Sequence, residues 1–270
     1  MKKSIDTMRQ LPTIKKHITR AVNAIGLAVA TVIACLAMTA CDNDDDNNYS
    51  VFPINRPNAL VTIKPAADGT TFYMQLDDST RITATNMAAA PYGNREVRAL
   101  TNFRMLAPTS DRHNYQVYIN WIDSVLTKDM AADLGTEGNV AKYHDDPVEI
   151  LRDWTVSEDG YLTIHFRTQW APTGVPHFVN LVATNPANPY ELTFFHNAQG
   201  VKGGYWGDGI VAFRLSQLPD TKGKTVDLTL HWQSFSGAKS VTFKYSTRKT
   251  TDKIQGLSFA QSAQFEKALK

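Results

Sequence analysis

The chain has 270 residues and a mass of 30.0 kDa, with 43% hydrophobic and 20% charged residues, a composition that excludes a disordered or collagen-like chain. Its formal charge is +2, but residues 1–40 hold six basic residues and one acidic residue, so the rest of the chain holds 22 basic and 25 acidic residues. This remainder has a net charge of about −3, which excludes nucleic-acid binding because that function needs a basic surface.

A lipoprotein signal peptide is predicted at residues 1–40. Basic residues up to Arg20 are followed by twenty uncharged residues and then by Cys41, which is the order found in secretory signal peptides. Residues 37–41 resemble the lipobox of bacterial lipoproteins, which implies cleavage between Ala40 and Cys41 and lipid attached to Cys41. An uncleaved membrane anchor is the alternative, since about twenty apolar residues can span a bilayer.

Cysteine usage agrees with this prediction. The chain contains only Cys35, within the signal peptide, and Cys41, which the lipid would occupy. A mature protein without a free thiol has no disulfide, no thiol nucleophile and no cysteine zinc site.

Residues 41–55 are predicted to be an acidic flexible tether. Four acidic residues and three asparagines occupy positions 42–48, and such a segment has nothing apolar to bury. An EF-hand calcium loop is excluded because Asn47 and Pro53 stand where that loop needs glycine and glutamate. The acidic run after Cys41 resembles the export signal of outward-facing outer-membrane lipoproteins in some anaerobic gut bacteria, and we expect this location.

Residues 56–128 are predicted to form a small barrel of five strands. Apolar and polar residues alternate, most clearly in Tyr115–Trp121, as in strands with one buried face. The expected strands are 59–64, 70–77, 80–85, 95–106 and 114–122, and this number and size fit a five-stranded barrel.

Residues 129–249 are predicted to be a linker and an antiparallel β-sandwich. The linker extends to about Pro147, with one helical turn at Met130–Leu134. Seven short strands separated by turn residues are typical of a sandwich; they are expected at 154–157, 161–169, 177–184, 190–196, 209–216, 225–233 and 240–247. Residues 250–270 are a polar tail.

These features together resemble the NigD-like lipoproteins. The resemblance rests on the leader and tether and on short segments of both halves: Ala59–Lys64, Phe72–Asp78, Asn86-Met87, Arg95–Leu100, Asp146–Glu149, Tyr161–Ile164 and Val241–Tyr245. It implies an OB-like N-terminal barrel, a C-terminal β-sandwich and a bacteriocin-immunity or accessory role. The resemblance assigns no catalytic or binding role to particular residues.

The segment Gly200–Gly209 is the candidate partner-binding loop. Five of its ten residues are glycine, which we interpret as a long hairpin with Tyr205 and Trp206 exposed at its tip. A phosphate-binding loop is excluded because a strand, not a helix, is expected next, at Ile210–Leu215. The alternative is that Trp206 folds back on the sandwich.

Polar residues on the expected strands offer candidate metal and acid–base sites. A metal could be held by His165 with Asp227 and His231 only if their strands were neighbours. Polar residues also belong on solvated faces, so we expect no metal and no cofactor. The run His144-Asp145-Asp146 is interpreted as a solvated linker, since adjacent residues of an extended chain point to opposite sides.

The sequence therefore predicts a non-catalytic envelope lipoprotein that binds an unidentified protein, peptide or glycan. An alternative is a hydrolase of envelope polysaccharide, which needs two carboxyl groups roughly 5–10 Å apart; the candidates are Asp153, Glu158, Asp159 and Glu191. A purely structural envelope protein is the third hypothesis.

Overall fold

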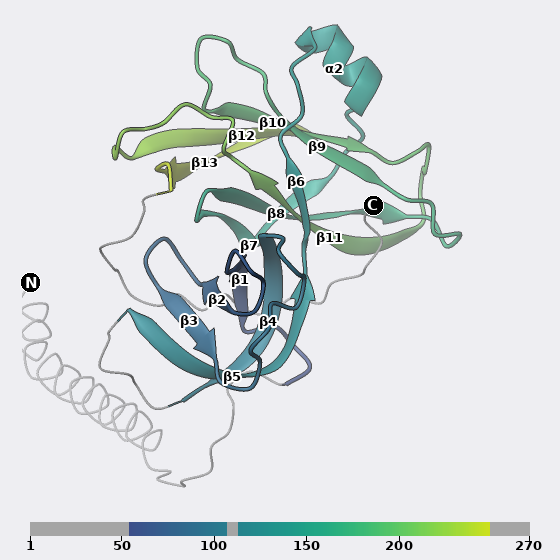
Figure 1. Ribbon diagram of the computed structural model, residues 1–270. Helices are drawn as coiled ribbons and strands as arrows, with labels where there is room; N and C mark the ends of the chain where they lie inside the picture. Colours follow the sequence, from purple (N-terminus) through teal and green to yellow (C-terminus); the bar gives the residue numbers. More distant parts are fainter. Residues whose placement is uncertain (1–53, 107–112, 249–270) are drawn as a thin grey trace, which may run out of the picture. The chain divides into compact units, whose positions relative to one another are not determined.

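The computed structural model describes residues 54–106 and 113–248, which belong to one compact unit of the chain, residues 50–270 (Figure 1). The predicted signal peptide, the tether up to residue 53 and the tail beyond residue 248 lie outside the described residues. The described part consists of β-strands and one short helix, so the all-β prediction is confirmed.

The first five strands form a closed barrel, as predicted. They are β1 (Ala59–Pro65), β2 (Phe72–Gln75), β3 (Arg81–Ala84), β4 (Val97–Met105) and β5 (Asn114–Ser124). Their order is β1-β2-β3-β5-β4, closed by antiparallel pairing of β1 with β4. The interior is filled by alternate apolar side chains such as Val61, Ile63 and Met74, all fully buried. The alternation in the sequence thus marks the inner face of the barrel.

The remaining strands form a sandwich of two four-stranded sheets. One sheet has the order β6-β11-β8-β7 and the other the order β13-β12-β10-β9. The strands are β6 (Leu126–Asp129), β7 (Glu149–Glu158), β8 (Tyr161–Trp170), β9 (Phe178–Ala183), β10 (Glu191–Asn197), β11 (Tyr205–Arg214), β12 (Val226–Ser234) and β13 (Gly237–Tyr245). The predicted sandwich is confirmed, with β6 in addition to the seven expected strands.

Two strand pairs of the sandwich are parallel, a correction to the fully antiparallel sandwich. β6 pairs with β11 and β10 pairs with β12 in parallel register. The chain passes from β10 to β11 in the opposite sheet before it returns to β12, and such a crossover permits two strands of one sheet to run in the same direction. Alternation identifies the buried face of a strand but not its neighbours.

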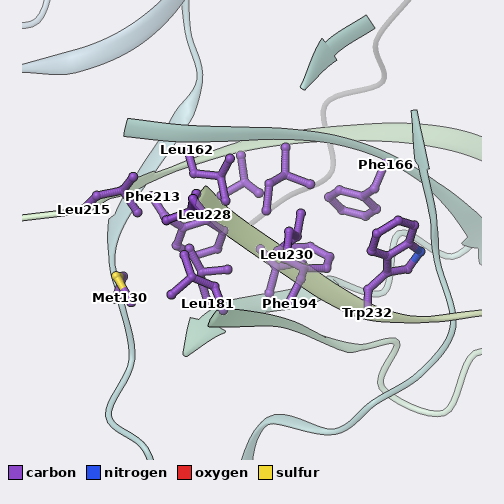
Figure 2. Close-up of a cluster of buried hydrophobic side chains, with 14 of the residues drawn as sticks. Met130, Leu162, Phe166, Leu181, Phe194, Phe213, Leu215, Leu228, Leu230 and Trp232 are labelled. Atoms are coloured by element: carbon purple, nitrogen blue, oxygen red, sulfur yellow. The ribbon is translucent and has the colours of Figure 1, made fainter. Parts of the chain in front are cut away.

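The core of the sandwich lies between its sheets (Figure 2). Leu162 and Phe166 of β8 point toward Phe194 of β10 and Leu230 of β12, and the rings of Phe166 and Phe194 are 5.4 Å apart between centroids. These side chains are buried, and part of the outer face of the β6-β11-β8-β7 sheet is covered as well, because Tyr161 and Ala212 pack with Leu60 and Leu100 of the barrel.

The helix α2 spans Gly135–Tyr143, so the prediction of a helical turn at Met130–Leu134 is wrong. Met130 is buried in the sandwich core, and Ala131 donates its N–H to the carbonyl of Leu181 in β9, at 2.8 Å. The segment before the helix is therefore bound to β9 at Ala131 and is not helical. The helix itself contains Gly135 and Gly138, which have low helix propensity and hide it in the sequence.

The hairpin of β7 and β8 contacts the barrel through its turn and one face. Asp159 and Gly160 form the two-residue turn with φ of 49° and 76°, the type I′ geometry that Asp-Gly favours. An apolar cluster includes Leu60 and Leu100 from the barrel and Trp154 from β7. In the described ranges no helix is long and apolar enough to cross a bilayer.

Candidate functional site

The glycine-rich segment links the two sheets of the sandwich. β10 ends at Asn197 in one sheet and β11 begins at Tyr205 in the other, so the prediction of a long hairpin is wrong. Glycines indicate that the backbone turns freely, but they do not indicate which sheet the next strand joins. Tyr205 and Trp206 are the first residues of β11 rather than a loop tip.

Gly204 allows the start of β11 to lie close to the backbone of β8. Its φ is 129°, and a Cβ atom at this position would lie 2.2 Å from the carbonyl oxygen of Trp170. The backbones can approach only because no side chain intervenes. This approach sets Tyr205 opposite Trp170 and Trp206 opposite Gln169.

Trp206 and Phe235 form an exposed aromatic pair. Their side chains are 53% and 43% exposed, and their ring centroids lie 5.0 Å apart at an interplanar angle of 68°. Trp206 comes from one sheet, whereas Phe235 lies in the turn between β12 and β13 of the other. The alternative in which Trp206 packs into the sandwich is not what the structure shows. Phe235 was missed, although an aromatic residue in a predicted turn was the available signal.

Glu149 holds the turn that carries Phe235. Its carboxylate accepts hydrogen bonds from Ser234 Oγ at 2.6 Å and from Lys239 Nζ at 2.8 Å. Burial acts to raise the pKa of Glu149, but the hydrogen bonds from Lys239 and Ser234 hold it below its usual value. The charged carboxylate therefore fixes the position of one ring of the aromatic pair.

A row of charged side chains crosses the sheet beside the aromatic pair. Arg167 of β8 is opposite Glu149 of β7 on one side and opposite Asp208 of β11 on the other. Arg167 donates Nε and Nη2 to the two carboxylate oxygens of Asp208, at 2.5 and 2.9 Å. Burial acts to raise the pKa of Asp208, but the contacts with Arg167 and His165 lower it.

The proposed metal ligands do not come together. His165 is in β8, whereas Asp227 and His231 are in β12 of the opposite sheet. His165 is buried against Asp208, and Asp227 is paired with Lys244 at the surface. Within residues 54–106 and 113–248 no group of three or more metal-ligating side chains is arranged to hold an ion. The strand order, which the sequence does not reveal, separates these residues.

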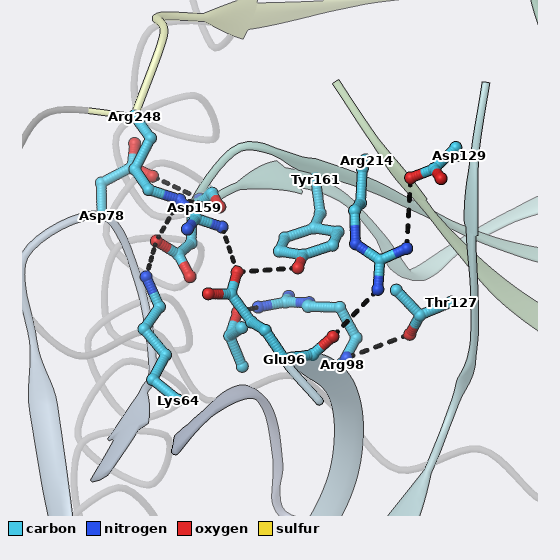
Figure 3. Close-up of polar contacts among 11 residues, drawn as sticks. Lys64, Asp78, Glu96, Arg98, Thr127, Asp129, Asp159, Tyr161, Arg214 and Arg248 are labelled. Carbon is cyan, nitrogen blue, oxygen red and sulfur yellow. Dashed lines mark hydrogen bonds and ion pairs between the residues drawn. The ribbon is translucent and has the colours of Figure 1, made fainter. Parts of the chain in front are cut away.

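Two of the four candidate catalytic carboxylates, Asp159 and Glu158, join the sandwich to the barrel, and Figure 3 shows the contacts of Asp159. Asp159 accepts from Lys64 Nζ at 2.8 Å, and its own N–H donates to Asp78 at 2.6 Å. Arg248 Nε donates to the carbonyl of Asp159 at 2.8 Å and its Nη2 to Glu96 at 2.6 Å. Glu96 also accepts from Tyr161. The turn of the β7–β8 hairpin is thus bound by charges from both sides.

Glu158 lies next to the most deeply buried cation of this junction. Arg98 is fully buried; its Nη1 donates to Thr62 at 3.1 Å and its Nη2 lies 3.6 Å from the Glu158 carboxylate. Burial raises the pKa of Glu158 to about 7, and the nearby charge of Asp78 adds to this, while Arg98 opposes it.

The other two candidate carboxylates lie elsewhere. Asp153 is exposed in β7, and Glu191 of β10 accepts hydrogen bonds from Asn185 and Asn188, each at 3.0 Å. The four residues therefore do not form one site, and the two at the junction are engaged by cations.

A buried histidine pair was missed by the sequence analysis. Nδ1 of His177 lies 2.8 Å from Nε2 of His196, and the ring of Trp170 stacks on His177 at 4.2 Å. Burial, and then the charge of His177, lower the pKa of His196 to about 4. Isolated histidines 19 residues apart give no signal in the sequence; the antiparallel pairing of β9 with β10 brings them together.

The run His144-Asp145-Asp146 is only partly a solvated linker. His144 and Asp145 are exposed, but the carboxylate of Asp146 accepts from the N–H of Ala198 at 2.7 Å and its carbonyl lies 3.1 Å from His196 Nδ1. The expectation is wrong for Asp146, since the carboxylate anchors the segment after β10. Ala40 and Cys41 lie outside the described residues, and their lipidation stays a prediction.

Comparison with known families matches both halves of the chain. The NigD-like N-terminal OB domain matches residues 60–125, and the NigD-like C-terminal beta sandwich domain matches residues 131–245. No curated protein matches the chain.

Solved structures of similar proteins come from species of Parabacteroides and Bacteroides. A protein of Parabacteroides distasonis described as toxin-related is 36% identical, with a TM-score of 0.59, and the match covers 70% of this chain and 92% of that one. A NigD-like immunity protein of Bacteroides caccae is 17% identical, with a TM-score of 0.52, covering 73% and 99%. A protein of unknown function from Bacteroides vulgatus is 19% identical, with a TM-score of 0.55, covering 75% and 96%. The last two share the fold.

Proposed function

Because this chain belongs to the NigD-like family, we propose that it is a non-catalytic lipoprotein of the cell envelope that binds a partner in an immunity or accessory role. The exposed aromatic pair of Trp206 and Phe235 is the observation that carries the proposal. Aromatic side chains held rigidly at a surface and surrounded by polar groups are typical of binding sites.

The family context supports the same reading. The 36% identical protein of Parabacteroides distasonis is described as toxin-related, and the resemblance to NigD-like lipoproteins implies immunity or an accessory role. The lipid predicted on Cys41 would hold the protein at the outer membrane, facing outward. Two of the carboxylates considered for hydrolysis, Glu158 and Asp159, contact Arg98 and Lys64 in the junction with the barrel, which argues against a hydrolytic role for these two residues.

The test is capture of a partner by the purified full chain from envelope extracts and culture supernatant. Wild type is compared with Trp206→Ala and with Tyr118→Ala, which removes a similarly exposed aromatic residue from the barrel. We expect one partner that binds wild type and Tyr118→Ala and is lost with Trp206→Ala. A partner retained equally by all three proteins would place the binding site elsewhere and overturn the proposal.

A further inference from the structure

We propose that the sheet face beside the aromatic pair binds an acidic protein segment that also carries apolar side chains. The inference rests on the proposed function, because it names the chemistry of the partner at the same site. Two observations support it: the arrangement of charges across the strands and the angle between the two aromatic rings.

The charges of this face are layered, with cations outermost. The side chain of Arg167 is 49% exposed, whereas that of its partner Asp208 is 8% exposed. Lys239 is 42% exposed and its partner Glu149 33%. Asp208 engages Nε and Nη2 of Arg167, so among the described contacts Nη1 is left for a ligand. A partner that approaches this face therefore meets positive charge first.

His165 contacts Asp208 from beneath the surface. Its Nε2 lies 3.2 Å from the carboxylate of Asp208, and its Nδ1 lies 2.8 Å from the carbonyl oxygen of Asp153. The carboxylate of Asp208 is therefore held by both His165 and Arg167, below the more exposed guanidinium of Arg167.

The exposure of these groups decides what a partner meets. Two cations, Arg167 and Lys239, are paired with two carboxylates, Asp208 and Glu149, and in each pair the cation is the more exposed side chain. An acidic segment is attracted to exposed cations, and the same cations disfavour a basic segment.

The aromatic pair lies at the end of this row. Trp206 is two residues before Asp208 on the same face of β11, and Arg167 is therefore its diagonal neighbour across the strands. The rings of Trp206 and Phe235 meet at 68°, edge to face. They form a corner that receives an apolar side chain, rather than the flat platform on which a sugar ring stacks. This favours a protein segment over a glycan.

The test uses the full chain with labelled twelve-residue peptides and fluorescence anisotropy. One peptide alternates leucine and glutamate, a second has glutamine in place of glutamate, and a third has lysine. An oligogalacturonate of similar charge is the glycan probe. We expect the Leu-Glu peptide to bind at least about tenfold more tightly than the others and to weaken as salt rises from 50 to 500 mM.

The variants separate charge from aromatic contact. Arg167→Gln and Lys239→Gln should each weaken binding of the Leu-Glu peptide about fivefold or more, and Lys244→Gln, on the same strand as Lys239 but paired with Asp227, should not. Trp206→Ala should abolish the binding. Thermal unfolding verifies that every variant is folded. If Arg167→Gln does not fold, Lys239→Gln still tests the role of charge, because it leaves the Arg167–Asp208 pair intact.

The inference would be overturned if no peptide bound, or if the Leu-Gln peptide bound as tightly as the Leu-Glu peptide. It would also be overturned if the charge variants bound the Leu-Glu peptide like wild type, or if the oligogalacturonate bound in place of the peptides. If the captured partner is lost with Trp206→Ala but not with the charge variants, the proposed function holds and only the inference of an acidic partner is rejected. If Trp206→Ala still captures the partner, the proposed function is contradicted instead.

Discussion

His177 donates a hydrogen bond through Nδ1 to Nε2 of His196, across 2.8 Å within the sandwich. The direction follows from Asp146, whose carbonyl oxygen can only accept and therefore receives the proton of His196 Nδ1, at 3.1 Å. In the neutral ring Nε2 of His196 is then an acceptor. His177 is thus the donor and His196 the acceptor of this hydrogen bond, and burial lowers the pKa of both rings.

Acidification should destabilise the protein through this pair. The pKa of His196 is lowered to about 4 from 6.5, so its contribution to stability is complete above pH 6.5 and is lost as the pH falls toward 4. The loss amounts to about 3 kcal/mol at most for a shift of this size. Denaturant unfolding between pH 4 and 8 measures it. His196→Leu should remove this dependence, and exposed His144→Gln should leave it unchanged.

Glu158 should act in the opposite direction. Burial raises its pKa to about 7 from 4.5, so the folded protein holds the proton more tightly than the unfolded chain. Its contribution is therefore greatest below pH 4.5 and is lost as the pH rises to 7. The stability of wild type minus that of Glu158→Gln should fall by up to about 3 kcal/mol over this range.

Exposed Asp129→Asn provides the matched control for Glu158, because it removes a carboxylate from the same junction. Its stability should parallel that of wild type between pH 4.5 and 7. A Glu158→Gln protein with the same pH profile as wild type would show that the Glu158 carboxylate is not held protonated by burial.

Gly204→Ala should destabilise the protein by about 3 kcal/mol or more, because it adds both backbone strain and a clash with the Trp170 carbonyl oxygen. Gly200→Ala is the matched control, since it has a φ of 78° and no atom within 4 Å of the added Cβ. It should cost only about 1 kcal/mol. Equal costs in thermal and denaturant unfolding would argue against a tight approach of β11 to β8.

Cys41→Ser should abolish labelling by radioactive palmitate and release the protein from the membrane fraction, since the predicted lipid is its attachment. Membrane retention of the variant would instead support an uncleaved anchor at residues 21–40. The folded domains should be unaffected, which the unfolding curve of the released protein verifies.

The inner faces of the strands could be predicted from the sequence because the pleat fixes a period of two. Leu162, Ile164 and Phe166 alternate with polar residues and are all buried. The start of β7 was missed, because a bulge between Leu151 and Val156 breaks this alternation. A regular period identifies a strand only where the ladder itself is regular.

The candidate site could be predicted only in part, for a related reason. Trp206 stands out in its glycine-rich surroundings, but its contact with Phe235 depends on the order of strands in two sheets. Glu149 and Ser234 are 85 positions apart, and no local pattern links them. Sequence periodicity is a local property, whereas the site is made of long-range contacts.

The junction between barrel and sandwich has a consequence for inheritance and engineering. Either half made alone would expose Leu60 and Leu100, or Trp154, to water, and the barrel would keep the guanidinium of Arg98 without the Glu158 carboxyl group that faces it. Exchange of one half between relatives should therefore yield soluble chimaeras only where both surfaces of the joint are exchanged as well. The barrel and the sandwich therefore have to be inherited or exchanged together rather than separately.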